Sequence, residues 1–275
     1  MIAMDFPIPE FNKEIESVTR IMKDAGKILL ENYENPKGIM RKPDKSFVTD
    51  VDKQVSELIV SSLGKQFPEY GFLDEEHGSK NIERRNIWIS DPLDGTLEYI
   101  EKTGDFGIII GLVNDRRPVL GATYKPQKDE LAYAAKGYGA YMIQNGLTSK
   151  LRVSDSADIH ALVSRARRNE ELEKMLGKIM PDSLEYMGGS LKTVEVAKGN
   201  ATLFLCPRAS TMSTWDLIPP TVILEEAGGR ITDLYGRKII METLEDNKNH
   251  NGVVATNGLV HEKVLKNVSS VLKYT

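Results

Sequence analysis

The stretch 86–96, "NIWISDPLDGT", places two aspartates three residues apart directly after an apolar run. The run 86–90 predicts a buried strand, and Pro92, which cannot donate a hydrogen bond to a neighbouring strand, is expected to end it. Gly95 allows a sharp turn, so Gly95 and Thr96 are expected to begin a short helix whose free N–H groups can bind an anion. Ligands of α/β proteins bind where a strand feeds a helix in this way.

The carboxylates of Asp91 and Asp94 would repel an anion bound at this turn unless a cation lay between them. A hard divalent metal ion that bridges the carboxylates to a phosphate would explain the whole motif, and Mg²⁺ is the first candidate. The alternative is a capped turn with two aspartates in solvent, and the motif taken alone is compatible with both interpretations.

Other acidic residues could join this pair from distant parts of the chain, namely Asp52, Glu75, Glu76 and Asp216. Asp52 and Asp216 are each expected in the first turn of a helix, one capped by Thr49 and the other by Ser213 or Thr214. Glu75 and Glu76 follow a short predicted strand, 70–73. Each of them also has an ordinary explanation, either as a carboxylate that complements a helix dipole or as a solvated surface pair.

Composition narrows the class of protein. The chain has 275 residues with 36 basic and 40 acidic side chains, and a net charge of −4 predicts neither nucleic acid nor an anionic membrane as a partner. The single cysteine, Cys206, excludes an intramolecular disulfide and a cysteine metal cluster. No signal peptide is recognisable and no apolar stretch approaches about 20 residues, so a soluble cytoplasmic protein is expected. No G-x-S-x-G, Walker or G-x-G-x-x-G motif occurs, so an enzyme of this sequence would use carboxylates, metal and water.

The pattern of apolar residues predicts two halves, residues 1–150 and 151–275. The first half begins with an amphipathic helix over 10–33 and a second helix after Thr49, and it continues with four β-type runs, at 105–113, 118–124, 130–135 and 139–143, that are typical of an antiparallel meander. From about residue 151 strands and helices alternate. The fold class predicted is therefore α/β, with an α+β N-terminal half.

Four segments then coincide in order along the chain: "VTDVD" (48–52), "DEE" (74–76), "DPLDGT" (91–96), and "WD" (215–216), which opens a helix ending in "EAGGRITD" (226–233). This arrangement resembles the Mg²⁺-dependent, lithium-sensitive phosphatase superfamily of inositol monophosphatases, fructose-1,6-bisphosphatases and 3'(2'),5'-bisphosphate nucleotidases. The resemblance implies a layered αβαβα sugar-phosphatase fold, with an antiparallel or mixed sheet and most metal ligands in the N-terminal half. A smaller α/β C-terminal half would carry Asp216 and substrate specificity, and the active enzyme would be a homodimer.

The resemblance also implies a role for each matching residue, with two to three Mg²⁺ ions in the site. Glu75, Asp91 and the carbonyl of Leu93 would hold the first ion, and Asp91, Asp94 and Asp216 the second. Glu75, with Glu76 and Asp52, would hold or orient a third. Thr96, paired with Asp52, would position or activate the attacking water, while the N–H groups of Gly95 and Thr96 would bind the phosphate.

Substrate specificity is expected from residues 162–214. "DGTLEY" (94–99) and "GGSLKTVEVAKGNATLFLCPR" (188–208) are similar to the nucleotidase branch, which implies that Lys192 and Arg208 bind a second phosphate and that Gly189 and Ser190 lie against the nucleoside. The chain departs from that pattern in several ways. The nucleotidase branch has a segment S-R-S-H where this chain has residues 164–167, so that Ala166 and Arg167 replace its second serine and its histidine. Gly189 also replaces a serine, and two extra residues separate Lys192 from Arg208. "STWD" (213–216) is closer to inositol phosphatases. Alternatively, Lys192 is a helix-surface lysine and Arg208 a solvated loop residue.

The predicted substrate is a small phosphorylated metabolite, with 3'-phosphoadenosine 5'-phosphate as the first choice. Inositol 1-phosphate and fructose 1,6-bisphosphate are the alternatives within the same superfamily. A non-catalytic metabolite-binding protein of this fold is a third hypothesis. It predicts the loss of at least one metal ligand, whereas every side-chain ligand position carries Asp or Glu.

Overall fold

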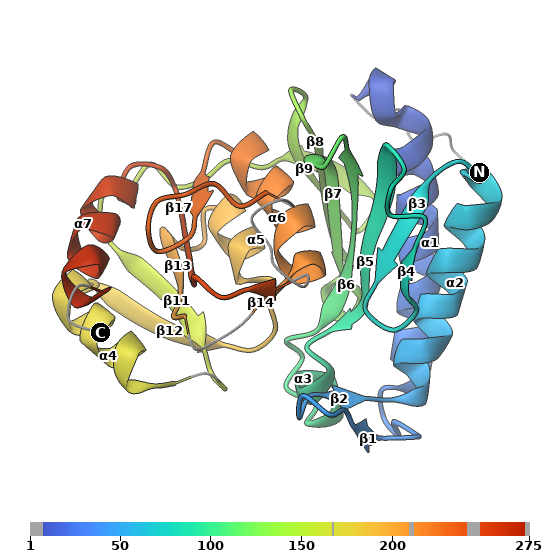
Figure 1. Cartoon of the computed structure of the whole chain (residues 1–275), viewed down its shortest axis with the longest axis horizontal. Coiled ribbons are helices and arrows are strands. Elements are labelled where there is room, and N and C mark those ends of the chain that lie inside the picture. The colour runs from blue at the N-terminus through green and yellow to red at the C-terminus, as the bar shows by residue number, and fades with distance from the viewer. Residues whose placement is uncertain (1–7, 167, 209–211, 241–247, 273–275) are drawn as a thin grey trace.

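The computed structural model describes residues 8–166, 168–208, 212–240 and 248–272, and these form the predicted layers of helix, sheet, helix, sheet and helix (Figure 1). One outer layer is α1 (Asn12–Asn32) and α2 (Asp50–Gln66), the middle layer is α5 (Lys192–Ala197) and α6 (Thr214–Glu226), and the other outer layer is α4 (Glu170–Ile179) and α7 (His261–Leu272). Each helix layer buries its apolar face against a sheet, so the αβαβα fold expected from the sequence is confirmed.

The large sheet has the strand order β10-β9-β8-β7-β6-β5-β3-β4. Its strands are β3 (Gly71–Asp74), β4 (Gly78–Lys80), β5 (Asn86–Asp94), β6 (Gly107–Asn114), β7 (Arg117–Lys125), β8 (Glu130–Ala135), β9 (Gly139–Gln144) and β10 (Leu147–Lys150). All neighbours are antiparallel except β3 and β5, which confirms the predicted meander. Strand β10 was not predicted, although Asn145-Gly146, both at positive φ (50° and 77°), is a frequent hairpin turn between antiparallel strands.

The small sheet has the order β12-β11-β13-β17-β15. It consists of β11 (His160–Ser164), β12 (Ser183–Met187), β13 (Leu203–Cys206), β15 (Arg230–Thr232) and β17 (Val253–Thr256). Strand β11 is parallel to β12 and β13, while β17 is antiparallel to β13 and β15, so the sheet is mixed. Short elements complete the chain: η1 (Pro9–Phe11), η2 (Pro126–Lys128), α3 (Thr96–Ile100), and the pairs β1 (Met40–Arg41) with β2 (Phe47–Val48) and β14 (Met212–Ser213) with β16 (Lys248–Asn249).

Helix α6 packs unusually close to the large sheet. A Cβ atom added to Gly121 of β7 would lie 1.9 Å from the carbonyl oxygen of Pro219, so only glycine permits this approach. The half-buried Trp215 packs against the same core. This packing brings the first turn of α6, which contains Asp216, to the carboxyl end of β5.

The prediction that Pro92 ends strand β5 is wrong. The strand continues to Asp94, which pairs with Gly107 of β6, and the register shifts between Asp91 and Asp94. Pro92 lies within this irregularity, where its missing N–H leaves no ladder hydrogen bond broken. Residues three apart in a regular strand point to opposite faces, so the bulge is what allows Asp91 and Asp94 to face one site. Helix α3 then begins at Thr96, as predicted.

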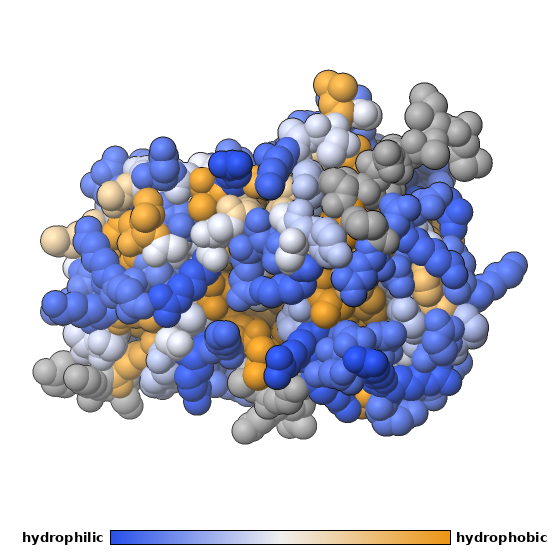
Figure 2. All heavy atoms as spheres, turned by 90° about the horizontal axis from the view of Figure 1, so that it is seen from above, coloured by the Kyte–Doolittle hydropathy of each residue, from blue (hydrophilic) through white to orange (hydrophobic). Residues whose placement is uncertain are grey.

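Polar and charged side chains dominate the face shown in Figure 2, and apolar side chains are visible mainly in the hollows between them. None of the helices in the described ranges is long and apolar enough to cross a bilayer.

Candidate active site

Three carboxylates from two distant segments meet at the end of β5, and we call Asp91, Asp94 and Asp216 the acidic cluster. One oxygen from each lies within 4.8 Å of the other two. The residues Asp91 and Asp94 are only 2% and 5% exposed, and Asp216 is half-buried. The structure therefore brings together the three aspartates that the sequence analysis assigned to one metal ion.

Backbone N–H groups orient each carboxylate of the acidic cluster. Leu93 donates to Oδ1 of Asp91 at 2.9 Å, and Ser190 donates to both oxygens of Asp94 at 2.9 and 2.8 Å. Asp216 accepts from the N–H of Ser213, the N-cap residue of α6, at 2.8 Å. Of the two caps considered for this helix, Ser213 is the one observed.

Burial and mutual repulsion dominate the electrostatics of the acidic cluster. Burial raises the pKa of Asp91 well above its ordinary value, and the negative charges of Glu75, Asp94 and Asp216 raise it further. Burial likewise raises the pKa of Glu75 to about 7, although Lys42 acts in the opposite direction. Buried carboxylates that destabilise one another in this way are stabilised by a cation, and an all-oxygen donor set suits Mg²⁺. The residues present therefore fit the metal site that the family resemblance implies.

Asp52 and Thr96 form a hydrogen-bonded pair beside the acidic cluster. The N–H and hydroxyl of Thr49 both donate to Oδ2 of Asp52, at 2.9 and 2.5 Å, which confirms the predicted helix cap. The hydroxyl of Thr96 lies 3.1 Å from Oδ1 of Asp52 and 3.0 Å from the carbonyl oxygen of Leu93. Burial raises the pKa of Asp52 to about 6, against the hydrogen bonds from Thr49 that favour the charged form.

Lys42 is a site residue that the sequence analysis missed. It follows β1, and its ammonium group pairs with Glu75 at 2.8 Å and with Glu76 at 2.5 Å. Burial alone would lower the pKa of Lys42, but the two carboxylates raise it, so the side chain stays charged. These contacts join residues more than 30 positions apart, and nothing in the local pattern around Lys42 signals them.

Gly189 and Ser190 lie directly against the acidic cluster. Gly189 has φ +61°, and a Cβ atom there would lie 2.8 Å from Oδ2 of Asp94, so glycine suits this position on both counts. The hydroxyl of Ser190 is buried and has no hydrogen-bond partner among the described residues. Such a group is free to bind a ligand or a water molecule.

Lys192 and Arg208 both contact protein groups. The side chain of Lys192 is buried, and its ammonium group donates to the carbonyl oxygens of Met187 and Gly188, each at 3.3 Å, and of Gly189. Arg208 donates from Nε to Glu171 of α4 at 2.6 Å and from Nη1 to the hydroxyl of Tyr235 at 3.2 Å. The alternative of a helix-surface lysine is therefore wrong, whereas Arg208 is a half-buried loop residue in an ion pair with Glu171. Phosphate binding by either residue stays a prediction. Ala166 follows the end of β11, and Arg167 lies outside the described residues.

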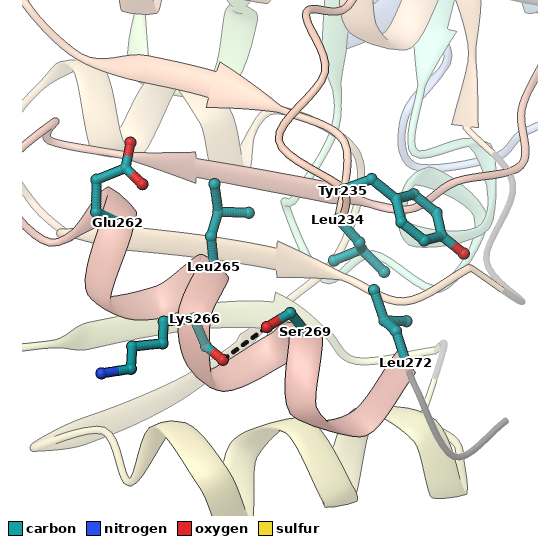
Figure 3. A pocket seen from close by; sticks show the side chains of 7 residues that line it. All are labelled: Leu234, Tyr235, Glu262, Leu265, Lys266, Ser269 and Leu272. Atoms are coloured by element: carbon teal, nitrogen blue, oxygen red, sulfur yellow. Dashed lines mark hydrogen bonds between the residues drawn. The ribbon is translucent and has the colours of Figure 1, made fainter.

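A groove of about 410 Å³ lies elsewhere, between α7 and the segment that follows β15 (Figure 3). Its lining residues are Leu234, Tyr235, Glu262, Leu265, Lys266, Ser269 and Leu272. None of them belongs to the acidic cluster, and α7 covers the outer face of the small sheet (Figure 1). The groove is therefore separate from the candidate active site.

Comparison with known proteins agrees with this geometry. The model of the inositol monophosphatase family matches residues 12–273. The 3'(2'),5'-bisphosphate nucleotidase CysQ of Salmonella typhimurium is 31% identical over 230 residues, which cover 82% of this chain and 92% of the relative. A fructose-1,6-bisphosphatase/inositol-1-monophosphatase of Thermotoga maritima is 27% identical over 264 residues, 92% of this chain and 95% of the relative. The solved structure of a Thermotoga maritima IMPase has the same fold, with a TM-score of 0.82 at 24% identity over 95% of this chain and 99% of its own. The chain belongs to the inositol monophosphatase family.

Proposed function

We propose that this protein is a Mg²⁺-dependent phosphomonoesterase whose preferred substrate is 3'-phosphoadenosine 5'-phosphate, that is, a 3'(2'),5'-bisphosphate nucleotidase. The observation that carries the proposal is the convergence of Asp91, Asp94 and Asp216 within 4.8 Å in a chain of the inositol monophosphatase family. Identity of 31% with CysQ nucleotidases favours this substrate. The Thermotoga relative, named for both activities, keeps inositol 1-phosphate and fructose 1,6-bisphosphate as alternatives.

The acidic cluster, Glu75 and the carbonyl of Leu93 would hold two Mg²⁺ ions, with Asp91 shared between them. A third ion would be held by Glu75, with Glu76 and Asp52. When bound, the ions would neutralise the charge of the phosphate, lower the pKa of a bound water and stabilise the leaving alkoxide. The raised pKa of Asp91 supports this assignment, because burial and the neighbouring carboxylates both disfavour its charged form and a bound cation would offset both effects.

Thr96 and Asp52 would position the attacking water. The capping interactions with Thr49 occupy Oδ2 of Asp52, so Oδ1 is the oxygen that faces the hydroxyl of Thr96. When that hydroxyl donates to Asp52, its lone pairs are directed away and can accept a hydrogen bond from water. Asp52, fixed and buried, can then take up the proton that the water loses.

The remaining assignments concern the substrate. The N–H groups of Gly95 and Thr96 would bind the scissile phosphate, and Gly189 and Ser190 would line the nucleoside site, where the unpaired hydroxyl of Ser190 offers a hydrogen bond. Lys192 and Arg208 are the candidates for the second phosphate, provided that substrate displaces their present contacts. Residues 1–150 would then supply most metal ligands, and residues 151–275 would supply Asp216 and specificity. We also propose a cytoplasmic homodimer that is inhibited by lithium.

The test is phosphate release by the purified protein in Mg²⁺, measured with four substrates at matched concentrations. These are 3'-phosphoadenosine 5'-phosphate, inositol 1-phosphate, fructose 1,6-bisphosphate and histidinol phosphate. We expect the highest kcat/KM with the first. Comparable kcat/KM values for the first two would contradict the choice of substrate, and no release from any of them would contradict the phosphatase function in favour of a non-catalytic binding protein.

A further inference from the structure

The turn that carries Gly189 and Ser190 contacts three acidic side chains of the N-terminal half, two of them through backbone N–H groups. Gly188 donates to Oδ2 of Asp105 at 3.0 Å, and Ser190 donates to both oxygens of Asp94. Glu98 lies against the same turn, since a Cβ atom added to Gly188 would lie 2.5 Å from its Oε1. All three carboxylates come from residues 94–105, the segment that begins with the last residue of β5. The turn therefore lies against acidic side chains that belong to the N-terminal half of the chain.

Lys192 and Arg165, which both belong to the C-terminal half of the chain, contact the same turn. The ammonium group of Lys192 donates to the carbonyl oxygens of residues 187–189. Burial raises the pKa of Glu98, and the charge of Lys192 acts in the opposite direction. Arg165 donates from Nη2 to Oδ2 of Asp105 at 2.8 Å, and its backbone N–H donates to the carbonyl of Met187 at 3.1 Å. Asp105 therefore links the turn to Arg165, the residue that directly follows β11.

The turn needs such support because its sequence does not stiffen it. Gly188 and Gly189 are adjacent, and glycine loses more conformational freedom on ordering than any other residue. The turn is also tightly packed, because a Cβ atom on Gly189 would lie 2.8 Å from both the carbonyl oxygen of Asp105 and Oδ2 of Asp94. A small shift of the turn would move the N–H of Ser190 away from the carboxylate of Asp94.

We propose that Asp105 and Glu98 are positioning residues that hold the Gly188–Ser190 turn against Asp94 and thereby fix the direction in which Asp94 presents its carboxylate to the metal. The inference rests on the proposed function, because that function assigns Asp94 to the metal. Groups that orient a metal ligand contribute to metal affinity and activity although they do not contact the ion. Neither residue needs to contact substrate in this role.

The test compares Asp105→Ala with Asp105→Asn, which keeps an acceptor oxygen for the N–H of Gly188. We expect Asp105→Ala to raise the half-saturating Mg²⁺ concentration about tenfold and to lower kcat by a similar factor, whereas Asp105→Asn stays within about threefold of the wild type. Glu98→Ala should change the Mg²⁺ dependence in the same direction. The matched control is Asp115→Asn, because Asp115 is also an aspartate paired with an arginine, Arg85, but on an exposed turn.

Wild-type Mg²⁺ dependence in folded Asp105→Ala would overturn the inference, and so would a loss in Asp105→Asn as large as in Asp105→Ala. If Asp105→Ala does not fold, Arg165→Met serves as the second variant and should shift the Mg²⁺ dependence about threefold in the same direction; no shift would overturn the inference. Mg²⁺ titration by calorimetry on the same variants reports the effect without turnover. A wild type that binds Mg²⁺ but hydrolyses no substrate would contradict the proposed function alone.

Discussion

Two buried groups of charged side chains in this molecule have opposite electrostatic character. The acidic cluster brings like charges together, and burial and repulsion raise the pKa of Asp91. The second group, which we call the ion-pair network, consists of Lys125, Glu130, Glu195 and Lys198 and joins α5 to the large sheet. Burial would raise the pKa of Glu195 too, but the charges of Lys125 and Lys198 outweigh it and lower that pKa to about 2.

The difference predicts which group is structural and which is functional. In the ion-pair network every charge has a protein counter-charge, since Lys125 lies 2.7 Å and Lys198 3.2 Å from oxygens of Glu195. In the acidic cluster the described oxygens accept backbone N–H groups, while neighbouring carboxylates destabilise the charged form of Asp91. A buried site with strongly perturbed carboxylates is a candidate for cation binding. A compensated network has a different signature, because removing one of its partners leaves a buried charge unpaired and destabilises the fold. Substitutions in the two groups should therefore have separable effects.

The largest effect is expected from Asp91→Asn, which should lower kcat by a factor on the order of 10³ or more. The substitution removes the negative charge that the two main ions would share, but it also removes repulsion among buried carboxylates. The free energy of unfolding of the metal-free protein should consequently stay the same or rise. Steady-state kinetics and urea unfolding of the same preparation measure both quantities.

Two outcomes would contradict that assignment. Activity near that of the wild type would exclude Asp91 from a shared position between the ions. A large loss of stability in the absence of Mg²⁺ would show that the acidic cluster is structural, like the ion-pair network. Mg²⁺ should also raise the Tm of the wild type more than that of Asp91→Asn, because only binding to the folded state stabilises it.

Glu195→Gln should give the opposite result, with a loss of about 3 kcal/mol in the free energy of unfolding and a kcat within about twofold of the wild type. The substitution leaves Lys125 buried without its counter-charge. Glu225→Gln is the matched control, because Glu225 pairs with Lys136 on the surface and should contribute less than about 1 kcal/mol. Equal destabilisation by the two variants would contradict the distinction between buried and exposed pairs.

The two groups should also differ in how they respond to pH. Without metal, burial and repulsion hold the pKa of Asp91 well above its ordinary value and that of Glu75 at about 7, so the folded state keeps protons that the unfolded state has lost. Stability then falls as pH rises through the folded-state pKa values, by about 1 kcal/mol between pH 6.5 and 8. Glu195 has a lowered pKa, so its stabilisation is lost only as pH falls below about 4.5.

The measurement is urea unfolding of the metal-free protein between pH 6.5 and 8. His261 sets the lower limit of this range, because burial lowers its pKa to about 4 and the unfolded histidine takes up a proton below about pH 6.5, with the opposite effect on stability. Asp91→Asn should reduce the slope. A stability that rises with pH in the wild type over this range would show that the acidic cluster is already neutralised by protein groups.

Much of the acidic cluster could be predicted because its residues lie in short sequence motifs that can be recognised without knowledge of long-range contacts. "DPLDGT" contains two of the three carboxylates, and the helix caps at Thr49 and Ser213 place Asp52 and Asp216 in first turns. The layered fold followed from the periodicity of apolar residues together with the family resemblance. The metal-binding roles of these residues stay predictions, but their proximity is a property of the fold.

The features that could not be predicted depend on contacts between distant segments. Pro92 signals the end of a strand, yet pairing with β6 continues beyond it to Asp94. Lys192 lies in a segment similar to nucleotidases, but its ammonium group binds the turn that precedes its own helix. Asp105 had no local signal, because its partners Arg165 and Gly188 are 60 and 83 positions away. Pairing of side chains across the two halves is decided by packing, which single-sequence patterns do not contain.

The smallest effect is expected from Lys42→Met, which removes a positive charge beside the acidic cluster. The ion pairs of Lys42 include a candidate metal ligand, Glu75, so its ammonium group offsets part of the negative charge at one edge of the site. Mg²⁺ and the ammonium group compete for the same carboxylate, and removing the ammonium group should lower the half-saturating Mg²⁺ concentration by about threefold. Lys45→Met, on the same hairpin but without an ion pair to a described residue, should leave that concentration unchanged. A higher half-saturating Mg²⁺ concentration in Lys42→Met would instead mean that Lys42 orients Glu75 for the metal. Lys42 would then support metal binding and not compete with it.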